Sequence, residues 1–259
     1  LLTVLDLGYT IAGSKEAYME RPFINHHYCP VVSPLTMDVK SSEAVTYLAE
    51  LGLPVYTTIV PNAGITSPMT MMGTLVVGNA EFLAINVYYQ MIREGMPIIY
   101  ANLPTVADMR TGNYTPGAVE TGMLVMAMAE MAIFYNVPSG GYIGLTNAHS
   151  NDAQSGYEVG INTTGALLAG ASLLNMGGLL DSLTTFDFAK AIIDNEVAMS
   201  LKRMQRGMEY SDENLCVAMI HENGHDPHYI ESEHTIMNMR KIAFLTDLGS
   251  RDSRVQWEA

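Results

Sequence analysis

The sequence has few cysteines and few positive charges. Its 259 residues include two cysteines, Cys29 and Cys216, and 13 lysines and arginines against 27 acidic residues. The two thiols lack the spacing of a metal site, and so few in a chain of this length favour a reducing compartment. The formal net charge of −14 argues against nucleic acid or an anionic membrane surface as a partner, since both are negative themselves. We therefore expect a cytoplasmic protein that binds neither.

Long apolar runs and nucleotide-binding motifs are also absent. Residues 165–180 come nearest to a membrane span, but this segment is short and rich in glycine. A helix end that runs into a buried strand explains it better, and we find no signal peptide. The chain has no P-loop, no dinucleotide fingerprint after a strand and no Gly-x-Ser-x-Gly nucleophile elbow. We therefore expect no membrane-spanning segment, and none of these motifs indicates a function.

What the sequence does contain is a repeated unit. A short apolar run of β-forming residues ends in polar residues or glycine, and a loop and a long apolar-striped helix follow it. The starts lie roughly 32 to 42 residues apart, which is the spacing of βα units. The runs occupy residues 54–62, 96–104, 137–147 and 173–178, with a weaker one at 22–30.

The repeat predicts a parallel βα array. With 48% hydrophobic and 15% charged residues, the chain suits a compact α/β enzyme with one large core. We count five units, whereas a closed (β/α)8 barrel of the TIM type needs eight. The tail from residue 207 has the pattern of helices and loops. We therefore predict a single barrel domain over residues 1–259, an incomplete part of a longer chain with about five βα units and C-terminal helices.

Polar residues gather at the predicted strand ends, where parallel βα arrays place their ligands. These ends are residues 25–28, 100–102 and 146–149. The loop that begins at residue 146 packs Thr, two Asn, His, Ser, Asp and Gln before the next helix. In one interpretation Asp152 or its neighbours merely cap that helix. In the other, His149 faces the barrel mouth.

The segment His26-His27-Tyr28-Cys29 lies at the end of the first predicted strand. Strand alternation sends His26 and Tyr28 to one face and His27 and Cys29 to the other. One face of a barrel strand is the interior, so one of the two pairs can meet a ligand. The alternative is that both histidines are buried and hydrogen-bonded.

Three tyrosines, Tyr28, Tyr100 and Tyr142, each lie near a predicted strand end. A ring of aromatic faces at that place would suit a quaternary ammonium group, because the faces attract a cation through cation–π interaction. Chance placement remains the alternative, since the chain contains 14 tyrosines.

Four histidines near the C-terminus could ligate zinc. They are His221, His225, His228 and His234. Their spacing matches no strong zinc motif, and Gly224 argues against the helical His-Glu-x-x-His arrangement of metalloproteases. A zinc-dependent barrel hydrolase therefore stays open as an alternative.

With these residues assembled, the chain resembles the trimethylamine methyltransferase family, the corrinoid-dependent barrels of methylamine metabolism. The resemblance spans nearly the whole chain, and members of the family are considerably longer. It rests on the segments AGSKEAYMERPF, CPVVSPL, NAGITSPMTMMGTLVVGNAE, DAQSGYE, IIDNEVAMSLKRM, SEHTIMNMR and RDSRVQWEA.

Within the family, this chain resembles the branch that lacks pyrrolysine and includes glycine betaine methyltransferase. Trimethylamine enzymes carry pyrrolysine near the stretch that matches residues 146–154, and the matching position here is His149. The chain departs from the family pattern at residues 222–230, where only Gly224 and His228 carry over.

The resemblance implies transfer of a methyl group from a quaternary amine to the cobalt(I) of a corrinoid, which a partner protein carries. It also implies self-association, and we expect no tightly bound metal. His149 is then the catalytic candidate, and Tyr28, Tyr100 and Tyr142 are candidates for the cation cage. Candidates for the remaining substrate contacts are Asn102 and His228, at its polar or carboxylate end, together with His26 and Gln154.

The substrate's tail stays open, because glycine betaine, proline betaine, carnitine and choline share the same cationic head. A second alternative also remains open beside the zinc hydrolase. The chain could be a betaine-binding subunit that keeps the pocket without turnover.

Overall fold

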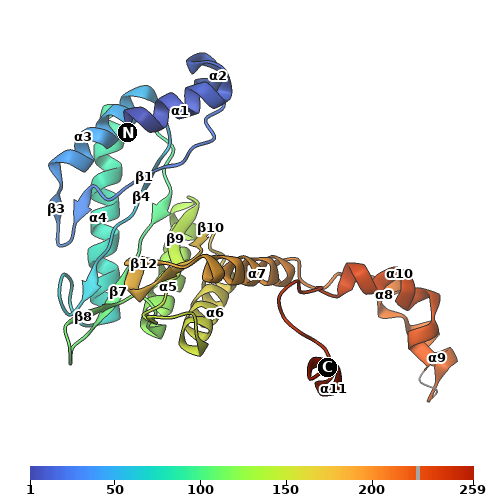
Figure 1. Cartoon of the computed structure of the whole chain (residues 1–259). Helices are drawn as coiled ribbons and strands as arrows, with labels where there is room; N and C mark the ends of the chain where they lie inside the picture. Colours follow the sequence, from blue (N-terminus) through green and yellow to red (C-terminus); the bar gives the residue numbers. More distant parts are fainter. Residues whose placement is uncertain (226–227) are drawn as a thin grey trace. The chain divides into compact units, whose positions relative to one another are not determined.

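The computed structural model describes residues 1–225 and 228–259. The chain divides into two compact units, Leu1–Ala191 and Ile192–Ala259, with the boundary inside helix α7 (Figure 1). The first unit contains every strand of the described residues and the candidate site. It opens with two helices, α1 (Leu2–Ala12) and α2 (Lys15–Glu20).

Five strands of the first unit run parallel, and they are neighbours in chain order. Strand β1 pairs with β4, β6 pairs with β9, and β9 pairs with β10, while bridges at Val55–Ile98 and Ile59–Asn102 join β4 to β6. The strands are β1 (His26–Tyr28), β4 (Val55–Thr57), β6 (Tyr100–Ala101), β9 (Ser139–Gly144) and β10 (Leu173–Met176). Each lies inside one of the five runs predicted from the sequence.

A long helix follows each of these strands, which confirms the repeated βα units. The helices are α3 (Val39–Leu51), α4 (Met71–Ile92), α5 (Val119–Tyr135), α6 (Ala153–Leu168) and α7 (Phe188–Gln205). Helices α3 to α6 pack side by side in chain order. In the described part of the chain, β1 and β10 do not pair with each other, so the array has the order of a barrel without closure.

Two side-chain hydrogen bonds show that the array is curved. His27 of β1 bonds to Tyr142 of β9 at 3.0 Å, and Asn175 of β10 bonds to Tyr56 of β4 at 3.2 Å. Each pair lies three strands apart, which in a flat sheet would be roughly 14 Å. Side chains on one flat face do not reach that far, so the sheet bends toward the face that lacks the helices.

The core lies between the opposite, convex face and the helices. Its largest cluster joins Val45 and Leu48 of α3, Phe82 and Ile85 of α4, and Tyr100 of β6. These residues are at least 98% buried. Burial of a large apolar side chain contributes roughly 1.5–3 kcal/mol, so this layer fixes the strands on the helices.

Helix α4 is the one helix in the described residues that is long and apolar enough to cross a membrane, by length and composition alone. Sequence reasoning named residues 165–180 as the nearest candidate and so missed this longer apolar helix. A core helix can pass the same test, and α4 packs against α3 and α5. Its buried Glu81 accepts hydrogen bonds from Ser33 Oγ at 2.7 Å and Leu35 N at 2.8 Å.

The loops that follow the parallel strands contain further short strands. After β1 come β2 (Val31–Val32) and β3 (Thr36–Met37), an antiparallel pair around the cis Ser33–Pro34 bond. A second sheet joins β5 (Asn62–Ala63), β7 (Thr105–Asp108) and β8 (Asn113–Thr115). After β10, the antiparallel pair β11 (Leu179–Leu180) and β12 (Thr185–Phe186) encloses the turn η1 (Asp181–Leu183).

The second unit is helical in its described residues, as expected for the C-terminal tail. Its elements after α7 are α8 (Asp212–Leu215), α9 (Val217–Asn223), η2 (His228–Glu231), α10 (Glu233–Ile242) and α11 (Arg254–Trp257). Asp226 and Pro227, within the segment that departs from the family pattern, lie outside the described residues.

Candidate functional site

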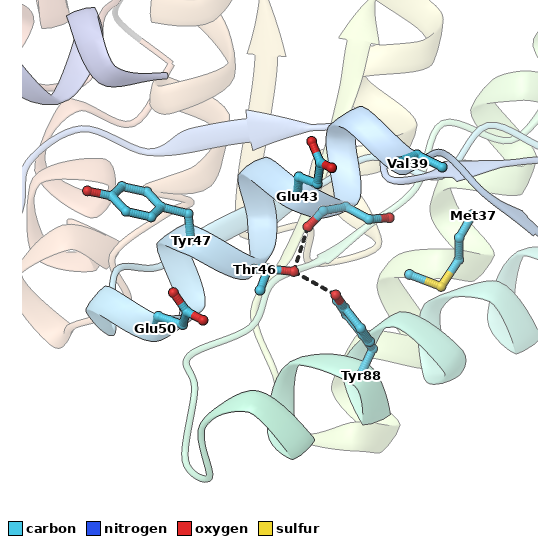
Figure 2. Close-up of a pocket in the computed structure, with 8 residues that line it drawn as sticks. Met37, Val39, Glu43, Thr46, Tyr47, Glu50 and Tyr88 are labelled. Carbon is cyan, nitrogen blue, oxygen red and sulfur yellow. Dashed lines mark hydrogen bonds between the residues drawn. The ribbon is translucent and has the colours of Figure 1, made fainter.

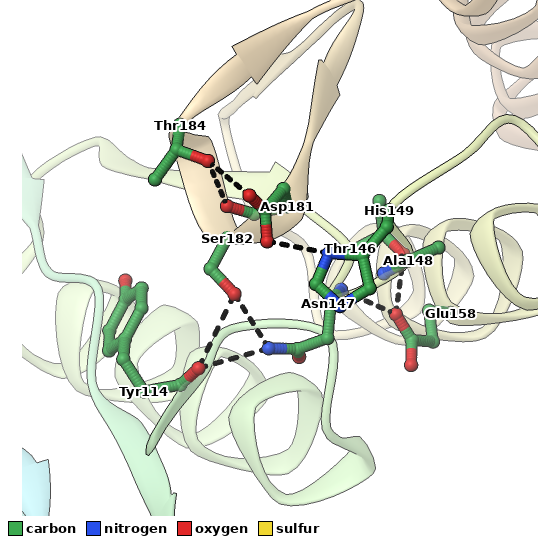
Figure 3. Close-up of polar contacts among 9 residues, drawn as sticks. All are labelled: Tyr114, Thr146, Asn147, Ala148, His149, Glu158, Asp181, Ser182 and Thr184. Atoms are coloured by element: carbon green, nitrogen blue, oxygen red, sulfur yellow. Dashed lines mark hydrogen bonds and ion pairs between the residues drawn. The ribbon is translucent and has the colours of Figure 1, made fainter.

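The loop after β9 is held by a buried carboxylate from the next helix. Oε2 of Glu158, in α6, accepts hydrogen bonds from Thr146 Oγ1 at 2.5 Å and Asn147 N at 2.8 Å (Figure 3). Its other oxygen accepts a bond from Gln154 Nε2 at 2.8 Å. Glu158 is 9% exposed, and its contacts fix the loop backbone that presents His149.

The same loop is tied to the loop after β6. Gly117 N donates to Asn147 Oδ1 at 2.9 Å, and Asn147 Nδ2 donates to Tyr114 O at 2.9 Å. A Cβ atom at position 117 would lie 2.2 Å from Glu158 Oε2 and 2.9 Å from Asn147 N. Only glycine allows the two loops to approach this closely.

A left-handed turn after β11 packs against the loop after β9. Asp181, Ser182 and Leu183 have φ values of 48°, 54° and 81°. This region costs a residue other than glycine roughly 1–2 kcal/mol. The turn is held against the loop after β9, because Asp181 N donates to Ala148 O at 2.8 Å and Ser182 N donates to Thr146 O at 3.0 Å.

His149 and Asp181 meet where the loop and the turn join. Nδ1 of His149 lies 2.8 Å from Oδ1 of Asp181. The Thr184 hydroxyl donates to Oδ2 at 2.7 Å. That hydroxyl and the nearby imidazole together lower the pKa of Asp181, so this carboxyl is ionised at neutral pH. The His149 side chain is 85% exposed, so its ring is open to a ligand.

A cavity of about 440 Å³ lies beside this pair. Its walls carry hydroxyls, amides and two carboxylates, those of Asp108 and Asp181. Arg110 donates hydrogen bonds to Asp108 and lowers the pKa of that carboxyl to about 2. The lining therefore suits a small polar or cationic molecule. It consists of Asp108, Thr111, Asn113, Tyr114, Thr115, Asn147, His149, Asp181, Ser182 and Thr184.

A second group of polar and aromatic side chains covers the concave face of the array. The His27 ring lies 5.1 Å from the ring of Tyr56 and 5.2 Å from that of Tyr142. Its Nε2 bonds to Thr58 Oγ1 at 2.5 Å, and Asn175 reaches Tyr56. Partial burial lowers the pKa of His27, so its ring is neutral at neutral pH. Neutral aromatic faces here can contact a cation without repelling it.

The predicted site residues divide between the two faces of the array. Tyr142 lies on the concave face, whereas Tyr28 packs into the core on the helix side. Tyr100 also faces the helices, where its hydroxyl donates to Asn79 at 2.9 Å. Asn102 is buried with its Nδ2 3.3 Å from Met128 Sδ, and its Oδ1 has no hydrogen-bond partner among the described residues.

His26 is buried and hydrogen-bonded, with Nε2 3.1 Å from the Tyr18 hydroxyl. This is the alternative that strand alternation left open for that residue. Gln154 bonds to Glu158, behind the loop rather than in the cavity lining. Asp152 does cap helix α6, because its Oδ1 accepts a bond from Ser155 N at 3.2 Å.

The C-terminal histidines lie in the second unit. His228 is exposed in η2, and His234 Nε2 lies 3.2 Å from Cys216 Sγ. Within residues 1–225 and 228–259, no three His, Cys, Asp or Glu side chains are grouped to hold a metal ion. Nothing in the described geometry therefore favours the zinc alternative.

Sequence reasoning missed Asp181, Ser182, Glu158 and Tyr56, and it did not select His27 over His26. Asp181 follows the fifth predicted strand by a few residues, so its place near a strand end could have been predicted from the sequence. Its contact with His149 depends on a turn that no local pattern encodes.

A larger hollow of about 550 Å³ lies on the helix side, between α3 and α4 (Figure 2). It is lined by Tyr47, Glu43 and Glu50 of α3 and by Tyr88, whose hydroxyl lies 2.6 Å from Thr46 Oγ1. No residue from the carboxyl end of a parallel strand lines it. The strand-end cavity is therefore the better candidate site.

A parallel βα array with a polar cavity in its strand-end loops defines an α/β protein with a candidate ligand site in the usual place for such arrays. The chain belongs to the trimethylamine methyltransferase (MTTB) family, whose profile matches residues 3–259. This confirms the resemblance seen in the sequence.

The similar proteins include methyltransferases named for trimethylamine and one named for glycine betaine. The chain is 33% identical over 256 residues to trimethylamine methyltransferase MttB of Desulfitobacterium hafniense, covering 99% of this chain and 51% of that protein. It is 29% identical over 254 residues to glycine betaine methyltransferase of the same species, covering 98% and 53%. It is 32% identical over 212 residues to MttB of Methanosarcina thermophila, covering 82% and 44%. The chain thus spans about half the length of these relatives.

Proposed function

We propose that the protein transfers a methyl group from a quaternary amine to the cobalt(I) of a corrinoid carried by a partner protein. The observation that carries the proposal is the polar strand-end cavity beside His149, in a chain related to methyltransferases for trimethylamine and for glycine betaine. The five βα units then form part of a longer (β/α)8 barrel. The protein works in the cytoplasm and self-associates.

The chemistry needs little from the protein beyond binding and orientation. The methyl carbon of a quaternary amine is bonded to a cationic nitrogen, and cobalt(I) supplies the nucleophile. As the carbon–nitrogen bond breaks, its electron pair stays on nitrogen, and a neutral tertiary amine leaves. No general acid is needed, so the protein must align the methyl group and stabilise the cation without covering it.

We assign Tyr142 to the cation cage, because its ring lies on the concave face beside the neutral ring of His27. His149 remains the catalytic candidate at the cavity. Four of the other candidates support the strands from the core and do not contact the substrate: Tyr28, Tyr100, Asn102 and His26. Gln154 supports the loop after β9 through its bond to Glu158. His228 remains a candidate for the substrate's polar end.

The test is anaerobic methylation of cob(I)alamin by the full-length protein, followed by absorbance. The panel contains glycine betaine, proline betaine, carnitine and choline, with trimethylamine for comparison. We expect turnover with at least one quaternary amine and none with trimethylamine. Absence of turnover with all of them, from folded protein, would contradict the proposal. Tight binding without turnover would indicate a betaine-binding subunit.

Two matched variants sharpen the test. His149→Gln should lower kcat/KM by roughly 10², the loss that misplacement of a bound substrate by about 1 Å can cause. His221→Gln replaces another exposed histidine, in α9, and should leave kcat/KM unchanged. Equal effects of the two substitutions on kcat/KM would contradict the assignment of His149 to the active site.

A further inference from the structure

The turn that carries Asp181 has unfavourable backbone angles, and it places the Asp181 carboxylate beside His149. Three consecutive residues other than glycine, Asp181 to Leu183, adopt left-handed backbone angles. Such residues persist only where the surrounding structure over-determines them, and they concentrate at functional sites. Here the turn directs the Asp181 carboxylate at the His149 imidazole, 2.8 Å away (Figure 3).

Several bonds fix this geometry from both sides. Asp181 N and Ser182 N donate to the carbonyls of Ala148 and Thr146, one and three residues before His149. Asn147 Nδ2 donates to Ser182 Oγ at 2.7 Å. Two backbone hydrogen bonds and one between side chains thus join the turn that carries the acid to the loop that carries the imidazole, and they restrain the position of one relative to the other.

The two carboxylate oxygens of Asp181 have separate partners. Oδ2 accepts the Thr184 hydroxyl at 2.7 Å, and Oδ1 lies against Nδ1 of His149. An ionised carboxylate is only an acceptor, so Nδ1 must carry a proton to bond to it. In the neutral ring, Nε2 then holds the lone pair. No other described residue bonds to that nitrogen.

We infer that Asp181 is a positioning residue for His149, which it holds as the Nδ1–H tautomer with the Nε2 lone pair free to contact a ligand in the cavity. For the reaction, the inference rests on the proposed function. An acceptor lone pair there attracts the positive methyl groups of a quaternary ammonium ion, and it accepts a hydrogen bond from a hydroxyl or N–H on the substrate's tail.

The first experiment reads the tautomer directly. Magic-angle-spinning 15N NMR of the full-length protein, with labelled histidine, is recorded at about pH 8.5, where histidine side chains are ordinarily neutral. The His149 signals are assigned by their loss in His149→Gln. We expect the Nδ1–H tautomer in the wild type. The Nε2–H tautomer there would overturn the inference.

Two variants test the cause. Asp181→Ala should shift His149 toward the Nε2–H tautomer. Thr184→Val, which removes the other bond to the same carboxylate, should leave the tautomer as in the wild type. An unchanged tautomer in Asp181→Ala would overturn the inference. If Asp181→Ala does not fold, the wild-type spectrum alone decides.

A kinetic cycle separates positioning from a merely structural role. Asp181→Asn should lower kcat/KM for methyl transfer at least tenfold in the wild type and less than twofold in the His149→Gln background. Equal losses in both backgrounds would contradict positioning. If the wild type transfers no methyl group at all, the proposed function fails, and the tautomer measurement still judges the role of Asp181.

Discussion

At the scale of single residues, Glu158 is the anchor of the site. Its oxygens receive two donors from the loop after β9 and one from Gln154. The amide of Glu158→Gln has one accepting oxygen and no charge, so at least one of the three donors loses its partner and the bonds that remain are weaker. An unsatisfied buried group costs about 1–3 kcal/mol, and we expect the free energy of unfolding to fall by that amount.

Urea denaturation of the full-length protein measures this loss. Gln154→Leu is the matched control, because it removes only the half-buried outer bond and should cost about 1 kcal/mol or less. Equal losses in the two variants would mean that the loop does not depend on the carboxylate.

Asp152, at the N-cap of α6, gives a pH-dependent prediction. The Ser155 N–H, aided by the Ser150 hydroxyl, lowers the pKa of this carboxyl in the folded protein. Such a group stabilises the fold above its unfolded pKa of about 3.9, and the contribution is lost as pH falls through the folded value. Asp152→Ala should therefore lower Tm at pH 7, and the gap should close as the pH falls below about 4.

Thermal melts from pH 7 to pH 3 check this, with Ser14→Ala as control. Ser14 caps α2 through a hydroxyl that accepts a bond from Ala17 N at 3.1 Å and does not titrate. Its effect on Tm should not change with pH. A gap for Asp152→Ala that also stays constant would exclude the ionised cap.

At the scale of elements, the α5–α6 contact depends on a glycine. A Cβ atom on Gly122 would lie 2.4 Å from Asn162 Oδ1 and 3.4 Å from the Asn162 backbone. Asn162 cannot turn away freely, because its Nδ2 donates to Gly117 O at 3.2 Å. Gly122→Ala should therefore lower the free energy of unfolding by about 1–3 kcal/mol, although alanine favours helix.

Gly160 offers the matched control inside α6. Nothing lies within 4 Å of a Cβ atom at this position, so Gly160→Ala should raise the free energy of unfolding by about 1 kcal/mol. Denaturation curves of the two variants should move in opposite directions. Stabilisation by both substitutions would show that α5 and α6 can separate at no cost.

The elements themselves were predictable, because apolar runs and helix stripes are local signals. All five parallel strands fall in the predicted runs. Which residues of each strand face the helices was not predictable. Alternation places His26 and His27 on opposite faces, but which face meets the helices is decided by packing against a core that includes residues far along the chain, such as Phe82 of α4. Two of the three tyrosines chosen for the cage accordingly lie on the helix side.

At the scale of the whole molecule, the sequence predicted an incomplete barrel, and the described residues form a curved array of parallel strands that does not close. Curvature follows from contacts between β1 and β9 and between β4 and β10, which span more than 100 residues. The mutual position of loop 146–149 and the turn at 181–183 is equally non-local. His149 was therefore selected from the sequence as a candidate, whereas its contact with Asp181 was not predicted.

The outer face of α4, α5 and α6 carries the last prediction. The three helices contain no lysine or arginine, and exposed apolar residues run along them. Among these are Val87 and Met91 of α4, 58% and 81% exposed, and Phe134 of α5, 77% exposed. Large apolar patches on a protein surface mark interaction sites. We expect a second copy of the protein to cover this face.

Light scattering after gel filtration of the full-length protein measures the assembly. A carboxylate placed in an apolar interface loses its hydration, so Phe134→Glu should shift the protein toward monomer. Ile11→Glu, at a 63% exposed position on α1, should leave the mass unchanged. A monomeric wild type, or an oligomer that Phe134→Glu leaves intact, would contradict this interface. In that case, the apolar character of α4 would need a different partner, and sedimentation with liposomes would test whether that partner is a membrane.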